Sequence, residues 1–223
     1  MKKLADVIAI DGPAASGKST IASKIAEVLN ITYVNTGNMY RAITLFVMQR
    51  GFNPNAKDAD QIVSCALNEI TLDYIRKDGS LELNGESVNQ AIRTPDVAKN
   101  VSFIAAMPIV RNWLVDKQRQ FAKLGMIVME GRDIGTVIFP NAKYKFFLTA
   151  SPEVRAQRRL EQEGESLASD TIATVAAEIA KRDEMDMNRA VAPLKQADDA
   201  MLIDTSDMTV DEIVDYITNK IDN

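Results

Sequence analysis

The stretch that most constrains the fold is residues 7–20, with the sequence VIAIDGPAASGKST. Its first four residues are apolar and suit a buried strand, and apolar residues at helical spacing follow from Ile21 to Val28. Between them lies a loop that begins at Gly12 and has the spacing glycine, four residues, Gly-Lys-Ser. A strand, such a loop and a helix in this order predict a phosphate-binding turn in an α/β protein.

Each part of this loop, the P-loop (residues 12–19), has a physical task. Glycines at positions 12 and 17 let backbone N–H groups turn inward around phosphate oxygens. The positive end of the following helix faces the same anion. Lys18 can reach the outer phosphates, and the Ser19 hydroxyl can bind Mg²⁺. The loop therefore predicts binding of a nucleoside triphosphate, with Ser19 as the metal ligand.

The composition excludes several other kinds of protein. The chain has 223 residues, 46% hydrophobic and 26% charged, as is typical of one globular domain with embellishments. Its net charge of −5 argues against a general nucleic-acid binder. Cys65 is the only cysteine, so we expect no intrachain disulfide or zinc cluster and a buried, inert thiol. The absence of histidine excludes that residue as base, nucleophile or metal ligand.

The apolar segments are too short for export or membrane insertion. The run that starts near the N-terminus is broken by Asp11, before it reaches the length of a signal-peptide core. No later segment approaches the length of a membrane span. We therefore expect a cytoplasmic protein that associates with neither membranes nor nucleic acid.

Short apolar runs alternate with helical patterns along most of the chain. Strands are predicted at residues 7–10, 31–34, 126–129, 145–148 and 200–203. Beyond the helix after the P-loop, helices are predicted at residues 39–49, 58–67, 94–107, 108–124, 152–163, 170–187 and after a capping box at Thr209 and Glu212. This alternation predicts an α/β fold with a parallel sheet of about five strands, flanked by helices.

Residues 70–93 depart from this alternation. Apolar and polar residues alternate over 71–76, a turn is predicted at 77–80, and the alternation resumes at 81–83. Asn84-Gly85 is the strongest short hairpin signal. The segment therefore predicts a small antiparallel sheet inserted into the main fold.

Three polar turns follow predicted parallel strands: the P-loop, residues 35–38 and residues 130–136. Ligands of such sheets bind at the carboxyl ends of the strands, so the three turns predict one site. Guanidinium groups near this edge suit two phosphate-bearing ligands. The arginines concerned are Arg41, Arg132 and Arg189 near the turns, Arg155, Arg158 and Arg159 on one helix face, and Arg182 on the next helix.

Structural explanations compete with these functional ones. Any one of these arginines could be an ordinary solvated charge. Asp133 could cap a helix, and Asp186 and Arg189 could form an exposed i, i+3 pair. Trp113 and the ten methionines are expected to serve packing.

Several segments together resemble the bacterial-type cytidylate kinases of the P-loop nucleoside monophosphate kinase family. They are residues 12–19, 36–41, 131–136 and 188–194, together with the inserted hairpin. The resemblance covers nearly the full length and respects order and spacing. Two departures are Asn35, where many members have aspartate, and Ser19 in place of a frequent glycine or threonine. Neither departure removes a group that phosphate chemistry requires.

The resemblance implies a P-loop kinase fold in three parts. Residues 1–69, 94–150 and 184–223 would form the core, residues 70–93 an extension of the domain that binds the nucleoside monophosphate, and residues 151–183 a helical lid. The implied activity is transfer of the γ-phosphoryl group of ATP to CMP or dCMP, with Mg²⁺, in a monomeric enzyme.

The resemblance also assigns roles residue by residue. ATP would contact Gly12, Pro13, Ala14, Ala15, Ser16, Gly17, Lys18, Ser19 and Thr20. CMP would contact Thr36, Tyr40, Arg41, Ser102, Arg111, Arg132, Asp133, Arg182, Asp186 and Arg189. The catalytic set would be Lys18, Arg132, Asp133, Arg155 and Arg158.

Within the CMP set, Ser102, Arg111 and Asp133 would contact the base edge, because a carboxylate accepts from the amino group of cytosine. Arg182 and Asp186 match ribose-binding positions, and the remaining arginines match positions that bind the phosphate.

The sequence leaves some choices open. The Mg²⁺ could be supported through water by Asp11, Glu130 or Asp133. The acceptor could instead be UMP, dTMP or shikimate. A nucleotide-binding regulator would carry a guanine-reading Asn-Lys-x-Asp motif, which this chain lacks, and a nucleic-acid-dependent ATPase is disfavoured by the acidic charge.

Overall fold

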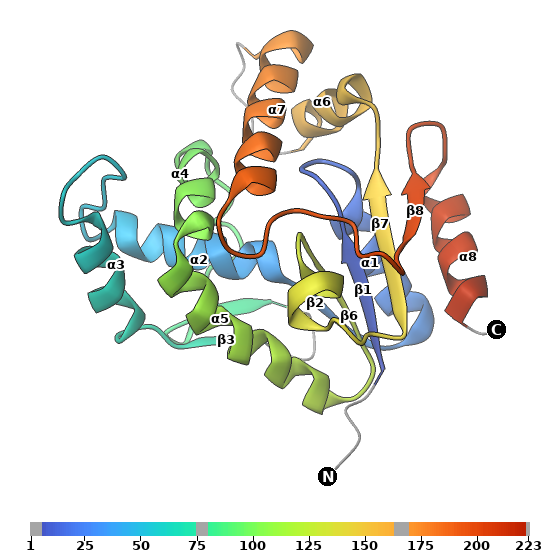
Figure 1. Ribbon diagram of the computed structural model, residues 1–223, viewed down its shortest axis with the longest axis horizontal. Helices are drawn as coiled ribbons and strands as arrows, with labels where there is room; N and C mark the ends of the chain where they lie inside the picture. Colours follow the sequence, from blue (N-terminus) through green and yellow to red (C-terminus); the bar gives the residue numbers. More distant parts are fainter. Residues whose placement is uncertain (1–5, 75–79, 163–169, 222–223) are drawn as a thin grey trace.

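The computed structural model describes residues 6–74, 80–162 and 170–221, and it contains two sheets (Figure 1). The larger sheet has five parallel strands in the order β2-β6-β1-β7-β8, and the smaller has three antiparallel strands in the order β3-β4-β5. The strands are β1 (Val7–Asp11), β2 (Thr32–Asn35), β3 (Leu72–Tyr74), β4 (Leu81–Leu83), β5 (Glu86–Ser87), β6 (Ile127–Gly131), β7 (Tyr144–Thr149) and β8 (Met201–Asp204).

Helices connect the parallel strands. They are α1 (Lys18–Leu29), α2 (Thr36–Met48), α3 (Ala59–Leu67), α4 (Pro95–Ala106), α5 (Pro108–Gln120), α6 (Pro152–Leu160), α7 (Ile172–Asn188) and α8 (Val210–Ile221), with a 3₁₀ helix η1 (Phe121–Leu124) and a π-helical turn η2 (Ile134–Ile138). The predicted α/β class, with a five-stranded parallel sheet and a small antiparallel one, is confirmed. The last helix carries the predicted capping box, in which the Glu212 N–H donates to Thr209 Oγ1 at 3.3 Å and the Thr209 N–H to Glu212 Oε2 at 2.8 Å.

The central strand β1 shows why the parallel strands read as continuous apolar runs. All five of its residues are buried, and successive side chains point to opposite faces of the sheet. Ile8 and Ile10 pack in one apolar cluster with α1 and α8. Val7 and Ala9 pack in another with η1 and η2. A strand covered on both faces has no position for a polar side chain until it ends at the rim.

A separate apolar core joins the small sheet to α2, α3, α4 and α5. Leu72, Leu81 and Leu83 are buried in the same cluster as residues from these four helices. Asn84 and Gly85 have φ angles of 52° and 83°, the left-handed backbone that a two-residue hairpin turn needs. The hairpin signal is thus confirmed, whereas the preceding turn and the end of its first strand (residues 75–79) lie outside the described residues.

Helices α6 and α7 stand above the carboxyl end of the parallel sheet (Figure 1) and pack against each other. Ala14 of the P-loop is buried in one small cluster with Ala156 of α6 and with Val175 and Ile179 of α7. The loop predicted at residues 164–169 lies outside the described residues.

Some local predictions were wrong. Residues 35–38 do not form a turn that precedes a helix starting at Met39. Instead, α2 already begins at Thr36, and the Asn35 side chain caps it by accepting a hydrogen bond from the Asn38 N–H at 3.0 Å. Glu130 and Gly131 belong to β6 instead of the turn after it. Cys65 is exposed, because α3 buries the face that carries Val63, Ala66 and Leu67.

The packing around Gly12 predicts a large effect of a small substitution. A Cβ at this position would lie 2.0 Å from the Leu148 carbonyl oxygen, and φ is +149°. We expect Gly12→Ala to lower the free energy of unfolding by about 2–4 kcal/mol, from backbone strain plus overpacking. Urea denaturation measures this quantity.

Gly51→Ala is the matched control, since φ is +78° there but a Cβ meets no atom within 4 Å. We expect a loss of about 1 kcal/mol from strain alone. Equal losses for the two variants would contradict the packing argument.

Candidate active site

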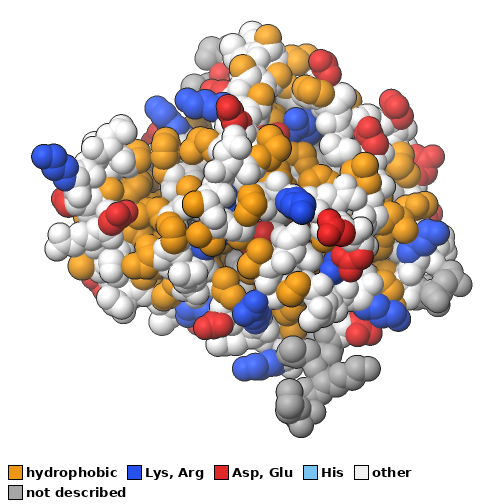
Figure 2. Space-filling model, viewed as in Figure 1, with side chains coloured by type: hydrophobic (Ala, Val, Ile, Leu, Met, Phe, Trp, Pro, Cys, Tyr) orange, Lys and Arg blue, Asp and Glu red, His pale blue; other side chains and the backbone are white. Residues whose placement is uncertain are grey.

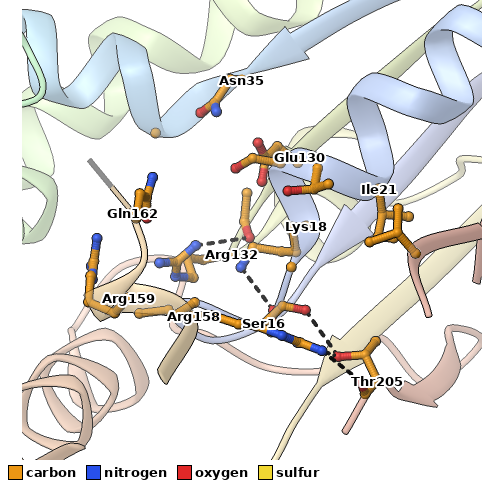
Figure 3. A pocket seen from close by; sticks show the side chains of 18 of the residues that line it. Ser16, Lys18, Ile21, Asn35, Glu130, Arg132, Arg158, Arg159, Gln162 and Thr205 are labelled. Carbon is orange, nitrogen blue, oxygen red and sulfur yellow. Dashed lines mark hydrogen bonds between the residues drawn. The ribbon is translucent and has the colours of Figure 1, made fainter. Parts of the chain in front are cut away.

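Three strands bring the predicted turns together at one rim. In the parallel register, Asp11 of β1 pairs with Gly131 of β6, and Glu130 of β6 pairs with Asn35 of β2. A cavity of about 470 Å³ opens at this rim. It is lined by the P-loop and the start of α1, the start of α2, the end of β6, helices α6 and α7, and the segment that follows β8 (Figure 3).

The P-loop has the backbone that a phosphate cradle requires. Gly12, Ala15 and Gly17 have positive φ angles of 149°, 57° and 87°. α1 begins at Lys18 and has no side-chain cap, so its first N–H groups are available to an anion. Lys18 Nζ donates to the Pro13 carbonyl oxygen at 2.5 Å and to Ser16 Oγ at 3.2 Å.

Lys18 is only 5% exposed, and this burial has a consequence for its charge. Burial lowers the pKa of Lys18 to about 7, with a further contribution from the positive charge of Arg132. An arriving polyphosphate would favour the protonated form. We therefore expect polyphosphate binding and protonation of Lys18 to be coupled.

Positive side chains crowd the cavity. Seven lining residues are cationic and two, Glu130 and Glu161, are anionic, although the whole chain has a net charge of −5. The cationic residues are Lys18, Arg41, Arg93, Arg132, Arg158, Arg159 and Arg182. On the face shown in Figure 2, by contrast, positive and negative side chains are interspersed. The positive charge is thus concentrated where a polyanion would bind.

The arginines of the cavity are held close to one another at an electrostatic cost. Burial lowers the pKa of Arg41 to about 10, with Arg93 and Arg132 adding to the effect. Burial also lowers the pKa of Arg159 to about 9, and that of Arg182 to about 10. Nε of Arg182 is buried with no hydrogen-bond partner among the described residues. These features fit phosphate groups, which supply acceptor oxygens and negative charge together.

The three carboxylates considered for Mg²⁺ support have different surroundings. Only Glu130 lines the cavity, and it accepts a 2.5 Å hydrogen bond from the Tyr33 hydroxyl. Asp11 accepts from the N–H groups of Ile134 and Gly135 at 2.8 and 2.7 Å. Burial raises the pKa of Asp11 to about 6 despite these bonds.

Asp133 belongs to a buried network beside the cavity. Arg111 Nη2 lies 2.6 Å from Asp133 Oδ2, and Arg189 Nη2 lies 3.5 Å from Asp133 Oδ1. Asp186 continues the network, with contacts of 3.0 Å to Arg132 and 3.4 Å to Arg189. Burial alone would raise the pKa of Asp186, but the surrounding arginines hold it below its usual range.

The buried network tests two of the structural explanations raised by the sequence, an exposed Asp186–Arg189 pair and a helix cap at Asp133. Asp186 and Arg189 do pair at i, i+3, but with side-chain exposures of 8% and 3% they do not form a solvated pair. Asp133 precedes η2 but makes no capping hydrogen bond. The Asp11 carboxylate accepts from the first N–H groups of η2 instead.

The remaining predicted CMP-binding residues surround this network. The Tyr40 ring lies 5.4 Å from the Arg111 guanidinium, and Thr36 Oγ1 donates to the Glu130 carbonyl oxygen at 2.7 Å. Arg41 donates to the Ile92 carbonyl oxygen at 3.1 Å and lines the cavity. Ser102 is half-buried on α4, and among the described residues no hydrogen bond links it to the network.

The two arginines of α6 that were predicted to be catalytic lie in different places. Arg158 lines the cavity and donates to the hydroxyl and carbonyl oxygens of Thr205 at 2.9 and 2.7 Å. Arg155 is not among the residues that line the described cavity, and its guanidinium contacts Asp183 and the Ala14 carbonyl oxygen.

The residues of the site that were not predicted from the sequence include Arg93 and Asp183. Arg93 lines the cavity beside Arg41, just before α4. In the sequence, the only indication of a role for Arg93 was its positive charge next to the predicted helix start at Thr94-Pro95. The buried Asp183 accepts from the Ala14 N–H at 3.0 Å. It follows Arg182 directly, but no local pattern pointed to its partner 169 residues away.

The fold and the cavity together define a P-loop kinase: a phosphate cradle follows the central strand of a parallel sheet, and arginines face it across the cavity. The family model described as cytidylate kinase matches residues 8–223. The chain therefore belongs to the cytidylate kinase family.

Relatives agree with this assignment. The chain is 45% identical over 214 residues to a cytidylate kinase of Clostridium botulinum, covering 96% of each chain, and 47% identical over 210 residues to one of Desulforamulus reducens, covering 94% of each. A crystal structure of an uncharacterized protein from Eubacterium ventriosum aligns with a TM-score of 0.54 at 17% identity, over 98% of this chain and 99% of that one, and shows a shared fold. None of the helices in the described part of the chain is long and apolar enough to cross a membrane.

The coupling between Lys18 and nucleotide binding can be measured. Because the pKa of Lys18 is about 7 without ligand, the residue is mostly neutral at pH 8 and takes up a proton when a polyphosphate binds. We expect uptake of about one proton per Mg·ATP bound at pH 8 and much less at pH 6, where Lys18 is already charged.

Calorimetric titration in buffers of different ionisation enthalpy gives the number of protons. The control is Lys24→Ala, which changes an exposed lysine of the same helix. Zero uptake at pH 8 would refute the coupling.

Proposed function

We propose that this chain transfers the γ-phosphoryl group of ATP to CMP or dCMP, giving ADP and CDP or dCDP. The observation that carries the proposal is that the P-loop, Arg41, Arg132 and Arg182 line one shared cavity, beside the buried Arg111–Asp133 pair. Membership of the cytidylate kinase family supports it. The P-loop would hold the donor, and the arginines opposite would hold the acceptor phosphate.

The donor end of the cavity suits ATP with Mg²⁺. Ser19 and Glu130 both line the cavity, and oxygen ligands are those that Mg²⁺ prefers. The described residues contain no cluster of three or more acidic, histidine or cysteine side chains, so the phosphates would supply most of the ligands. We assign the Ser19 hydroxyl as direct ligand and Glu130 as the support through water. Bound there, Mg²⁺ would neutralise charge on the outer phosphates.

The acceptor end suits a cytosine nucleotide. The Asp133 carboxylate can accept from the amino group of cytosine, and Arg111, held by Asp133 at 2.6 Å, can donate to the ring carbonyl or nitrogen. Uracil presents a carbonyl where cytosine has the amino group, and this carbonyl would oppose the carboxylate. Thr36, Tyr40 and Ser102 complete the proposed CMP-binding set.

The proposed mechanism needs no histidine. The second pKa of a phosphate monoester is ~6, so the acceptor oxygen of CMP is already largely anionic at pH 7. The barrier lies in bringing two anions together and in stabilising the charge on the phosphoryl group during transfer. Lys18, Arg132 and Arg158 would stabilise that charge, and Arg41, Arg182 and Arg189 would orient the acceptor nucleotide.

We propose that the chain works as a cytoplasmic monomer with three parts. Residues 1–69, 94–150 and 184–223 would form the core, and residues 70–93 would extend the part that binds CMP. Residues 151–183 would form a lid whose closure excludes water, which otherwise competes with CMP as acceptor.

The acceptor is identified by initial rates with CMP, dCMP, UMP and AMP under equal conditions, with ADP release as the readout. We expect CMP and dCMP to exceed UMP and AMP by at least about 10²-fold in kcat/KM, because a mismatched base leaves buried polar groups unpaired. A preference for UMP would overturn the assignment of Asp133 to cytosine.

Lys18→Ala should lose at least about 10²-fold in kcat while Lys24→Ala remains near wild type.

Asp133→Asn tests how the base is selected. Both asparagine and alanine at this position remove the negative charge that faces Arg111 and Arg189. Asparagine keeps the shape and one oxygen acceptor, whereas alanine would also leave a gap and no acceptor and would threaten the fold. We expect KM for CMP to rise about 10-fold or more while KM for ATP changes less than about 3-fold. The control is Asp116→Asn, which alters an exposed carboxylate of α5. Equal effects on both substrates would contradict the assignment.

A further inference from the structure

A buried ion pair between α6 and α7 binds both backbone polar groups of one P-loop residue, Ala14. Asp183 Oδ1 of α7 accepts from the Ala14 N–H at 3.0 Å, and Asp183 Oδ2 is bound by Arg155 of α6. The same Arg155 nitrogen donates to the Ala14 carbonyl oxygen at 3.2 Å. Both polar groups of Ala14 are thus fixed by a charged partner, in an arrangement named here the Asp183–Arg155 clamp.

The surroundings of the clamp make these contacts strong. The side chains of Asp183 and Arg155 are 9% and 11% exposed. Ala14 is buried with Ala156, Val175 and Ile179, so few water molecules can compete for the hydrogen bonds. Charge-assisted bonds in such a dry environment define one geometry more sharply than exposed ones do.

The clamp lies next to a strained point of the backbone. Ala15 has a φ of +57°, a left-handed conformation that an alanine adopts only when its surroundings impose it. Four described residues other than glycine have positive φ, of which two are the more tolerant asparagines and two are alanines, Ala15 and Ala192. An arginine binds a carbonyl group near each of these alanines. Arg155 donates to the oxygen of Ala14, the residue before Ala15, and Arg189 donates to the Ala192 oxygen at 2.5 Å.

We propose that Asp183 and Arg155 are positioning residues that hold the P-loop in its phosphate-binding conformation by fixing Ala14, and with it the left-handed turn at Ala15. The inference rests on the proposed function in one respect, that the P-loop binds ATP. It gives Arg155 a role different from the other arginines of α6. Arg158 and Arg159 line the cavity, whereas Arg155 acts on ATP only through the loop.

A direct role of Arg155 as a phosphate ligand fits the structure less well. If its guanidinium moved into the cavity, the buried Asp183 carboxylate would lose its counter-charge, and this costs much more than breaking an exposed ion pair. The Ala14 carbonyl oxygen would lose its donor at the same time. The arginine therefore stays with the loop when nucleotide binds.

The first experiment measures binding of Mg·ATP and of CMP separately, by calorimetry, to the full chain carrying Asp183→Asn or Asp183→Ala. We expect Kd for ATP to rise about 10-fold or more, with the larger effect for alanine, and Kd for CMP to change less than about 3-fold. The asparagine variant keeps the volume of the side chain and covers the case in which the alanine variant fails to fold. Glu184→Gln is the matched control, because it removes one negative charge from the next, exposed position of α7.

The second experiment separates geometry from charge, since Asp183 also lies close enough to influence the pKa of Lys18. Glycine adopts positive φ without strain, so Ala15→Gly removes the need for the clamp. In the Asp183→Asn background, Ala15→Gly should restore most of the lost ATP affinity, to within about 3-fold of wild type.

The possible outcomes are distinct. Unchanged ATP affinity in both Asp183 variants overturns the inference. Equal losses of ATP and CMP affinity, with a lowered Tm and no rescue by Ala15→Gly, also overturn it, because they indicate only a structural role. Both readouts are binding measurements without phosphoryl transfer. If ATP affinity depends on the clamp but the chain fails to phosphorylate CMP, the result would contradict the proposed function and leave this inference intact.

Discussion

The structure depends on a concentration of like charge in a confined space. Seven cationic side chains line a cavity of about 470 Å³, in a chain whose overall charge is negative. Burial lowers the pKa values of Lys18, Arg41, Arg159 and Arg182, and repulsion from neighbouring arginines lowers them further. Confining these charges together is electrostatically unfavourable, and a bound polyphosphate would offset their repulsion.

Carboxylates outside the cavity make this concentration tolerable. Asp11, Asp133, Asp183 and Asp186 are all buried, and none of them lines the cavity. Each holds either an arginine or a backbone segment of the site in place. Asp11 fixes the start of η2 and Asp183 fixes the P-loop, while Asp133 and Asp186 hold Arg111, Arg132 and Arg189. Because these carboxylates do not line the cavity, the surface that would meet the phosphate groups remains positive.

Local patterns predicted most of the fold. The five parallel strands followed from short apolar runs, since a strand buried on both faces has little room for polar side chains. The hairpin followed from Asn84-Gly85, and the last helix from the capping box at Thr209 and Glu212. The start of α2 was missed because Thr36, Gly37 and Asn38 read as a turn, whereas the Asn35 cap and the tertiary packing make them helical.

The sequence indicated which arginines belong to the site but did not distinguish their individual roles. Arg155, Arg158 and Arg159 share one helix face by their spacing, so sequence reasoning treated them alike. The structure separates Arg155, because Asp183 of the neighbouring helix takes it up. Arg93 gave almost no signal, since its place beside Arg41 depends on how the inserted sheet packs against α2 and α4.

The phosphate cradle could be read from the sequence alone, because the P-loop is contiguous. Its glycines shape the local backbone, and its lysine and serine follow at fixed spacing. The sequence also determined the order of strands and helices, which follows from hydrophobic periodicity. Which carboxylate pairs with which partner depends on the three-dimensional packing. Asp183 lies 169 residues from Ala14, and Asp11 lies 123 residues from Ile134. No local pattern records such pairings, because they exist only after the sheet has brought the strand ends together and the helices have packed over them.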